Sequence, residues 1–194
     1  NHHFRSATNQ TPKEFQHGQK VNTKNIFLQL KLIADVGLIG LPNAGKTSLL
    51  NELTAANAKV ANYAFTTLEP NLGVMKSGGI IADIPGLIEG ASNGRGLGIK
   101  FLKHIERTKL LVHCLSTESQ DPLHDYQTVR NELSSYSSKL SEKPELIILT
   151  KSDLVSPEKL SSLQKKLNAK LAVSIIDTDS LKKLNDLIAK VLNK

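Results

Sequence analysis

The chain contains no tryptophan and one cysteine, and only 4% of its 194 residues are aromatic. A single cysteine, Cys114, excludes a disulfide framework and any zinc site built from several cysteines, and it favours a reducing compartment. Because Cys114 lies in the apolar run KLLVHCLS, we expect a buried, inert thiol. The scarcity of aromatic residues argues against a surface that stacks single-stranded bases.

Long hydrophobic runs are also missing. No segment approaches the ~20 apolar residues that a membrane-spanning helix needs, so no membrane span is expected, and there is no secretory signal pattern. The composition, 39% hydrophobic and 22% charged, predicts a soluble globular protein. The first residue is Asn1 rather than Met, so we expect a piece of a longer protein. A net charge of +7 suggests a polyanionic partner such as RNA; the alternative is a generally lysine-rich surface.

Two parts are expected along the chain. Residues 1–28 are mostly polar and irregular, and they are interpreted as a linker or the end of a preceding module. Residues 29–194 alternate between apolar runs and helical periodicity, which predicts an α/β fold with a mainly parallel six-stranded sheet and helices on both faces. The expected strands are 31–39, 72–77, 79–84, 109–116, 144–150 and 171–176. The expected helices are 46–56, 95–108, 122–140, 157–169 and 179–193.

The segment GLPNAGKT, residues 40–47, matches the pattern GxxxxGK(S/T) of a phosphate-binding loop. We call it the phosphate loop. Glycines allow backbone N–H groups to point at a phosphate, Lys46 can reach the β and γ phosphates, and the Thr47 hydroxyl can bind Mg²⁺. The expected helix adds its positive N-terminal end. The loop comprises Gly40, Leu41, Pro42, Asn43, Ala44, Gly45, Lys46 and Thr47.

The identity of the base is indicated by LTKSD, residues 149–153, at the end of a later strand. The Asp153 carboxylate can accept hydrogen bonds from N1–H and the 2-amino group of guanine, whereas adenine offers no such pair of donors. The aliphatic stem of Lys151 can lie along the base plane. Guanine is therefore predicted over adenine. Thr150 occupies a position where Asn is more usual.

Two further segments carry residues suited to sensing a γ-phosphate. In ADIPGLIEG, residues 82–90, Asp83 can hold Mg²⁺ through water and the Gly86 N–H can meet the γ-phosphate. In NYAFTTLEPNLG, residues 62–73, one threonine can add a hydroxyl to Mg²⁺ while the γ-phosphate is present. The residues alone do not choose between Thr66 and Thr67.

The segments LKLIADVGLIGLPNAGKTSLLNEL, FTTLEPNLG, DIPGLIEGAS and GRGLGIKFLKHIERT together resemble the Obg family of GTPases, also called CgtA. The resemblance implies a Ras-like P-loop NTPase fold, a slow GTPase cycle with fast nucleotide exchange, and association with the large ribosomal subunit during assembly. It also implies a link to guanine-nucleotide stress signals. Residues 1–28 then look like the end of the family's glycine-rich N-terminal domain, and residues 29–194 form the GTPase domain.

The resemblance assigns roles residue by residue. It implies that Thr67 is the switch threonine, and that Mg²⁺ is held by Thr47, Thr67 and Asp83. Residues with catalytic roles are Lys46, Thr67, Gly86 and Asn43. The nucleotide-binding residues beyond the phosphate loop are Phe65, Thr66, Thr67, Leu68, Glu69, Asp83, Ile84, Pro85, Gly86, Thr150, Lys151, Ser152, Asp153, Ser174, Ile175 and Ile176.

The chain departs from the family pattern at three places. Thr150 stands where Asn is usual, and Ser174-Ile175 stands where Ser-Ala is usual, although the Ile175 N–H can still meet the guanine O6. Arg95 lies in a stretch that tends to be small or neutral in relatives. It is interpreted as a solvent-exposed residue, with a cis arginine near the phosphates as the alternative.

Hydrolysis is expected to be slow, because Leu87 follows the DxxG glycine where Ras-type enzymes have a water-orienting Gln. Asn43 resembles the Asn of GxPNxGK loops that helps to bind K⁺, which would act like an arginine finger. The alternative is that Asn43 fills a loop position with left-handed backbone geometry.

We therefore expect a monomeric, Mg²⁺-dependent GTPase switch in large-subunit assembly, in the bacterial cytoplasm, with an organelle left open. A guanine-nucleotide sensor with incidental hydrolysis is the alternative. TKSD argues against a third reading, an ATPase or kinase.

Overall fold

The structure is a computed structural model that describes residues 2–21, 23–24, 34–54, 59–60, 71–84, 106 and 108–192. Among the described residues before 34, the one regular element is the 3-10 helix η1 (His2–Phe4), and almost all side chains are exposed. The expected boundary at 28–29 lies outside the described residues, so the division of the chain into two parts stays a prediction.

The described strands form one sheet of seven strands in the order β2-β3-β4-β1-β5-β6-β7. β1 pairs in parallel with β4 and β5, and β6 pairs in parallel with β5 and β7. Antiparallel pairing is confined to β2–β3 and β3–β4 within this sheet. The strands are β1 (Val36–Ile39), β2 (Lys59–Val60), β3 (Asn71–Val74), β4 (Ile80–Asp83), β5 (Leu110–Ser116), β6 (Glu145–Thr150) and β7 (Leu171–Val173).

The mainly parallel α/β sheet is therefore confirmed, and all six expected strands are present together with one more. The additional strand, β2, is a two-residue edge strand. Two residues carry no hydrophobic periodicity, so this strand leaves no trace in the sequence.

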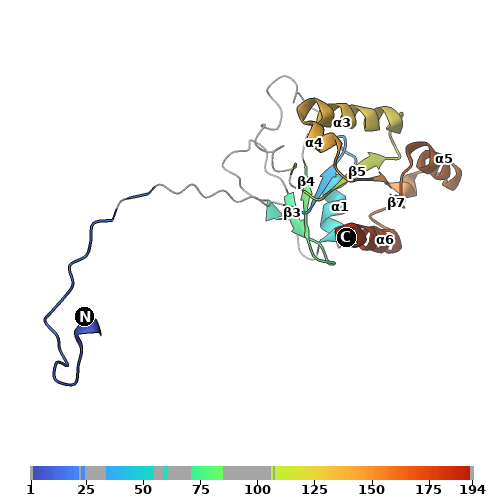
Figure 1. The fold of residues 1–194 in the computed structure, drawn as a ribbon. Helices are drawn as coiled ribbons and strands as arrows, with labels where there is room; N and C mark the ends of the chain where they lie inside the picture. Colours follow the sequence, from blue (N-terminus) through green and yellow to red (C-terminus); the bar gives the residue numbers. More distant parts are fainter. Residues whose placement is uncertain are drawn as a thin grey trace.

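Helices cover both faces of the sheet, as predicted (Figure 1). They are α1 (Lys46–Leu53), α3 (Pro122–Tyr136), α4 (Ser138–Ser141), α5 (Pro157–Leu167) and α6 (Thr178–Leu192). Alternate residues of β5 face opposite sides: Val112 packs in the cluster with α1 and α6, whereas Leu111 packs with α3 and α4. Because β1 and β5 are buried on both faces, they appear as continuous apolar runs.

Two helices begin where their sequences carry cap signals. The Asp121 carboxylate accepts hydrogen bonds from the N–H groups of Leu123 and His124, and Pro122 is the first residue of α3. The Ser156 hydroxyl accepts from the Lys159 N–H, and Pro157 opens α5 in the same way. A polar cap followed by proline satisfies free N–H groups and fixes the first backbone angle.

Several predicted elements end earlier than expected, among them the strand expected over 72–77, which ends at Val74, and the helix expected over 157–169, which ends at Leu167. The helix expected over 46–56 ends at Leu53, because Thr54 is extended and bridges to Met75. The helix expected over 122–140 is divided at Ser137, which has an extended backbone. The strand expected over 171–176 ends at Val173. The helix expected over 95–108 lies outside the described residues except for Glu106 and Thr108.

A turn at Gly78-Gly79 connects β3 and β4. Their φ angles are 87° and 88°, in the left-handed region where glycine has no steric penalty. The Met75 N–H donates to the Gly79 carbonyl at 3.0 Å, which closes the turn.

Cys114 is fully buried, as expected, and burial raises the pKa of its thiol to about 12. Almost no thiolate exists near neutral pH, so the cysteine is inert. Among the described residues, no helix has the length and apolar character required to span a membrane.

A buried polar group holds α3 against the sheet. His113 on β5 has no exposed surface, and its Nδ1 lies 2.7 Å from the Glu145 carboxylate at the start of β6. Arg130 of α3 lies 3.5 Å from the same carboxylate and also donates to the Ser141 carbonyl at 2.7 Å. The Glu145 carboxylate thus has partners on both β5 and α3, which offsets the cost of burying it.

Glu132 on α3 provides a pH-dependent prediction. Burial raises the pKa of its carboxyl to about 7. The folded state therefore binds the proton of the Glu132 carboxyl more tightly than the unfolded chain does. The contribution of this proton to the free energy of unfolding is full below the unfolded pKa and is lost as the pH rises toward 7. We expect Glu132→Gln to raise the free energy of unfolding by about 1 kcal/mol at pH 8, a value discounted for partial exposure, and by much less at pH 4.5.

Urea denaturation at the two pH values measures this difference. Glu142→Gln, at an exposed position after α4, is the control and should show no such pH-dependent gain. An equal effect of Glu132→Gln at pH 4.5 and pH 8 would contradict the assignment.

Candidate functional site: a phosphate loop and a base pocket at one sheet edge

The phosphate loop turns sharply between β1 and α1. Gly40 has a φ of 143°, Asn43 of 61° and Gly45 of 80°, all in the region that favours glycine or Asn. A Cβ on Gly40 would lie 2.4 Å from the backbone oxygen of Cys114 on β5. Gly40 is therefore required because the loop passes directly against the neighbouring strand.

The Lys46 side chain folds back over this loop. Lys46 is only 7% exposed, and its ammonium donates to the carbonyls of Gly40 at 3.0 Å and Leu41 at 2.9 Å. Gly45 is the N-cap residue of α1 and has no side chain that could cap the helix. The N–H groups of the first helical turn have no partner within the helix, so they are available for an anion at this point.

Thr47 and Asp83 meet beside the loop. The Thr47 hydroxyl donates to the Asp83 carboxylate at the end of β4. Asp83 is 3% exposed, and its other carboxylate oxygen, Oδ1, is buried with no hydrogen-bond partner among the described residues. An orphaned buried carboxylate oxygen next to a hydroxyl is a donor set that fits Mg²⁺.

The described residues contain no cluster of three or more His, Cys, Asp or Glu that could hold a metal ion. A hydroxyl and one carboxylate match Mg²⁺ sites in which phosphate and water supply the remaining ligands.

The end of β6 is tied to the phosphate loop. Thr150 is 4% exposed, and its hydroxyl lies 2.8 Å from the Ala44 carbonyl, to which it donates. The position where Asn is usual therefore has a hydroxyl that binds the loop directly. Lys151 follows with a left-handed φ of 57°, and the 3-10 helix η3 (Ser152–Leu154) turns the chain along the edge of the sheet.

A cavity of about 250 Å³, which we call the base pocket, opens at this edge. Gly45 and Ser48 line it from the side of α1. Further lining residues lie at or after the ends of β5, β6 and β7: Glu118, Thr150, Lys151, Asp153, Leu154, Val173, Ile175 and Ile176. Leu154 is 55% exposed and Ile176 is 76% exposed, so both present apolar surface at the pocket. Apolar walls with the carboxylate of Asp153 suit a planar base with hydrogen-bond donors.

Three of the N–H groups in the loop after β7 donate to acceptors within that loop or at the start of α6. The N–H of Ser174 donates to the Ser180 hydroxyl, that of Ile176 to the Ser174 hydroxyl, and that of Asp177 to the Ser174 carbonyl. The Ile175 N–H is not among these donors. The Ile175 side chain is larger than the alanine that is usual at this position. It is 48% exposed and lines the base pocket.

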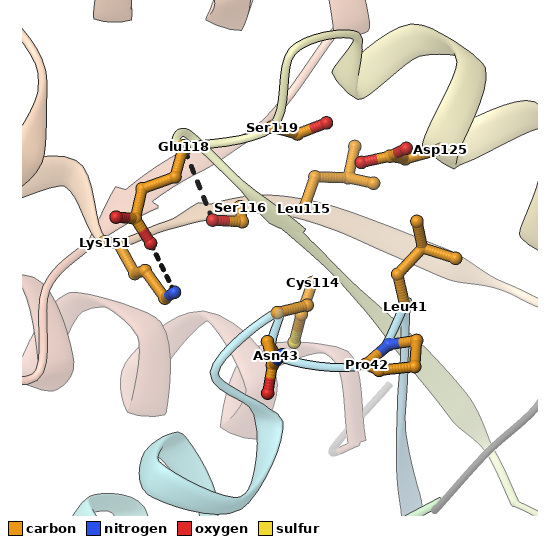
Figure 2. A pocket seen from close by; sticks show the side chains of 11 residues that line it. Leu41, Pro42, Asn43, Cys114, Leu115, Ser116, Glu118, Ser119, Asp125 and Lys151 are labelled. Carbon is orange, nitrogen blue, oxygen red and sulfur yellow. Dashed lines mark hydrogen bonds and ion pairs between the residues drawn. The ribbon is translucent and has the colours of Figure 1, made fainter.

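A second cavity of about 210 Å³, the loop cavity, adjoins the phosphate loop (Figure 2). Leu41, Pro42 and Asn43 line one side, and residues at and after the end of β5 line the other. Figure 2 shows Glu118 and Lys151 close together at one end, joined by an ion pair. Both residues also line the base pocket.

The structure thus gathers the phosphate loop, Asp83, Thr150 to Asp153 and Ser174 to Ile176 at one edge of the sheet. Ile84 differs, because its side chain is buried in the core with Ile39 and Leu111. Several predicted residues lie outside the described part of the chain: Phe65, Thr66, Thr67, Leu68, Glu69, Pro85, Gly86, Leu87 and Arg95.

The sequence reasoning missed Glu118. Its signal was weak but present: a carboxylate two residues beyond the end of a predicted parallel strand lies at the edge where such sheets bind ligands.

A testable prediction for this site concerns the hydroxyl of Thr150. Thr150→Val keeps the shape but leaves the buried Ala44 carbonyl without its donor, so we expect a loss of about 1–2 kcal/mol in the free energy of unfolding. Amide hydrogen exchange in residues 44–47 should become faster. Thr150→Ser retains the hydroxyl and serves as the control. Unchanged exchange in Thr150→Val would show that the bond does not hold the loop.

Comparison with known proteins shows which family this chain matches. Residues 35–151 match the family model described as "50S ribosome-binding GTPase". The chain is 49% identical to GTPase Obg of Finegoldia magna, aligned over 100% of this chain and 48% of that protein. It is 48% identical to GTPase Obg of Pelagibacter ubique, over 100% of this chain and 61% of that protein. The chain spans about half the length of these curated relatives.

Solved structures show the same fold. The cytosolic domain of the T. maritima FeoB iron transporter, in its GMPPNP form, has a TM-score of 0.60 and 26% identity, covering 84% of this chain and 65% of that chain. The G domain of T. maritima FeoB has a TM-score of 0.58 and 25% identity, covering 80% of this chain and 96% of that chain. The Ras-like P-loop fold is confirmed.

The family match covers more than half of the chain, and the resemblance read from the phosphate loop, the switch segments and LTKSD agrees with the named relatives. The chain therefore belongs to the 50S ribosome-binding GTPase family, and its resemblance to the Obg members of that family is confirmed.

Proposed function

We propose that the chain binds GTP at this sheet edge and hydrolyses it to GDP and phosphate in an Mg²⁺-dependent cycle. The observation that carries the proposal is the hydrogen bond from Thr150 to Ala44, which joins a phosphate loop to a segment suited to reading guanine. Both the base and the phosphates of one nucleotide then have partners within a single rigid edge.

The phosphates would lie against the first turn of α1. The loop glycines expose backbone N–H groups there, and the buried ammonium of Lys46 adds a positive charge that can move from the loop carbonyls to the β and γ phosphates. This charge offsets the negative charge that develops during phosphoryl transfer.

Thr47 and Asp83 would hold Mg²⁺ through a hydroxyl and a carboxylate. When bound, Mg²⁺ neutralises charge on the β and γ oxygens. The carboxylate also keeps the Thr47 hydroxyl oriented, since the two are hydrogen-bonded. The roles of Thr67 and Gly86, in segments outside the described residues, stay predictions.

Guanine would enter the base pocket. The Asp153 carboxylate accepts from N1–H and the 2-amino group, the Ile175 N–H donates to O6, and Lys151 and Leu154 provide walls along the ring faces. Ser152 belongs to the short 3-10 helix that carries Asp153 to this position.

Hydrolysis by the chain alone is expected to be slow, since Leu87 cannot orient a water molecule. The backbone of Asn43, with a φ of 61°, gives a conformational reason for this residue that needs no ion. K⁺-dependent turnover through Asn43 stays a prediction.

We further propose that the whole protein acts as a switch on the large ribosomal subunit. The family's description as ribosome-binding and the net charge of +7, which favours contact with a nucleic-acid backbone, support this partner. Turnover measured with and without ribosomal particles distinguishes the switch from a nucleotide sensor with incidental hydrolysis.

Base selectivity follows from Asp153. Asp153→Asn removes one acceptor, adds a donor and removes the charge, so one hydrogen bond to guanine is lost and the other is weakened. We expect guanine nucleotides to bind about 100-fold more weakly. Xanthine nucleotides, which offer an acceptor at C2, should bind better than to the unchanged protein. Competition against a labelled nucleotide measures both effects.

The control is Asp186→Asn, an exposed carboxylate on α6 outside the pocket. It should leave both affinities unchanged. Equal guanine affinity in Asp153→Asn would remove Asp153 from base recognition.

A further inference from the structure

The ion pair between Lys151 and Glu118 lies between the base pocket and the loop cavity. The Lys151 ammonium lies 2.5 Å from the Glu118 carboxylate, and the side chains are 32% and 50% exposed. Figure 2 shows the two side chains extending toward each other, Glu118 from the segment after β5 and Lys151 from the end of β6. Both residues line both cavities, so the pair is a shared wall.

The backbone around Glu118 is anchored to the segment that carries Lys151. The Thr117 hydroxyl donates to the Lys151 carbonyl at 2.7 Å, and the Thr117 N–H donates to the Thr150 carbonyl at 3.1 Å. The Glu118 N–H donates to the Ser116 hydroxyl at 3.2 Å. The carboxylate is thus presented by a short, tied turn whose position is set by β5 and β6.

This anchoring matters because a lysine stem has four carbons and many rotamers. Left free, the stem of Lys151 would have to lose that rotamer freedom whenever a base enters the pocket. A partner that already holds the ammonium at the rim removes part of this entropic cost before binding. The left-handed backbone of Lys151, with a φ of 57°, directs the residue away from the regular course of β6.

We propose that Glu118 is a positioning residue for base recognition: it holds the Lys151 ammonium so that the aliphatic stem forms a fixed wall of the base pocket. The inference rests on the proposed function. Since the pair lies at the base end of the site, it acts equally on GDP and GTP and leaves the chemistry at the γ-phosphate unchanged.

A double-mutant cycle tests this coupling in the full chain, with Glu118→Gln, Lys151→Met and both together. Kd for labelled GDP and GTP and kcat are measured for each. Glu118→Gln should raise both Kd values by the same factor of about three to five, the range for a partly exposed ion pair, with kcat unchanged. The effect should shrink to less than about twofold at 1 M salt. In the Lys151→Met background, Glu118→Gln should have no further effect.

A nucleotide-free readout separates this inference from the proposed function. The ¹³C order parameter of the Lys151 ε-methylene, assigned by its absence in Lys151→Met, should fall in Glu118→Gln and stay unchanged in Glu142→Gln. Failure of the unchanged protein to bind guanine nucleotides would overturn the proposed function, whereas the order parameter separately reports whether Glu118 holds the Lys151 stem.

Three outcomes would overturn the positioning role. One is tighter nucleotide binding in Glu118→Gln, which would mean that the carboxylate mainly repels phosphate. Another is an equal loss of affinity in the Lys151→Met background, which would mean that Glu118 acts without Lys151. The third is an unchanged order parameter of the Lys151 ε-methylene in Glu118→Gln.

Discussion

The site depends on the close approach of three parallel strands at their carboxyl ends. Gly40, after β1, lies so near the Cys114 carbonyl of β5 that no side chain fits, and Thr150, ending β6, donates its hydroxyl to Ala44 in the phosphate loop. Residues 106 positions apart are thereby joined by one buried hydrogen bond. Because buried polar groups must be paired, this bond fixes the loop relative to the base pocket.

The apolar core makes such an edge possible. β1 and β5 are buried on both faces, α1 and α6 pack on one side, and α3, α4 and α5 pack on the other. A rigid parallel sheet presents all its carboxyl ends along one line, so loops that follow different strands meet there without long connections. The same geometry brings Glu118, after β5, to Lys151, after β6.

Features specified by short local segments could be predicted from the sequence, whereas contacts between distant segments could not. GLPNAGKT and LTKSD are local patterns whose glycines, lysines and carboxylate specify chemistry directly, so their meeting was predictable once a parallel sheet was inferred. Element ends were not: Thr54 leaves α1 to bridge Met75, and β7 stops at Val173. The Glu118–Lys151 pair and the Thr150–Ala44 bond depend on register between distant segments, which no local pattern encodes.

The central claim is that one sheet edge binds a nucleotide by its phosphates and selects guanine by its base. Displacement of labelled GDP by unlabelled GTP and by ATP, with and without Mg²⁺, tests it most directly. The account predicts that GTP displaces GDP at concentrations at least about 100-fold lower than ATP, the factor expected when a site built for hydrogen-bond donors meets a ligand that lacks them. Equal displacement by ATP would contradict it.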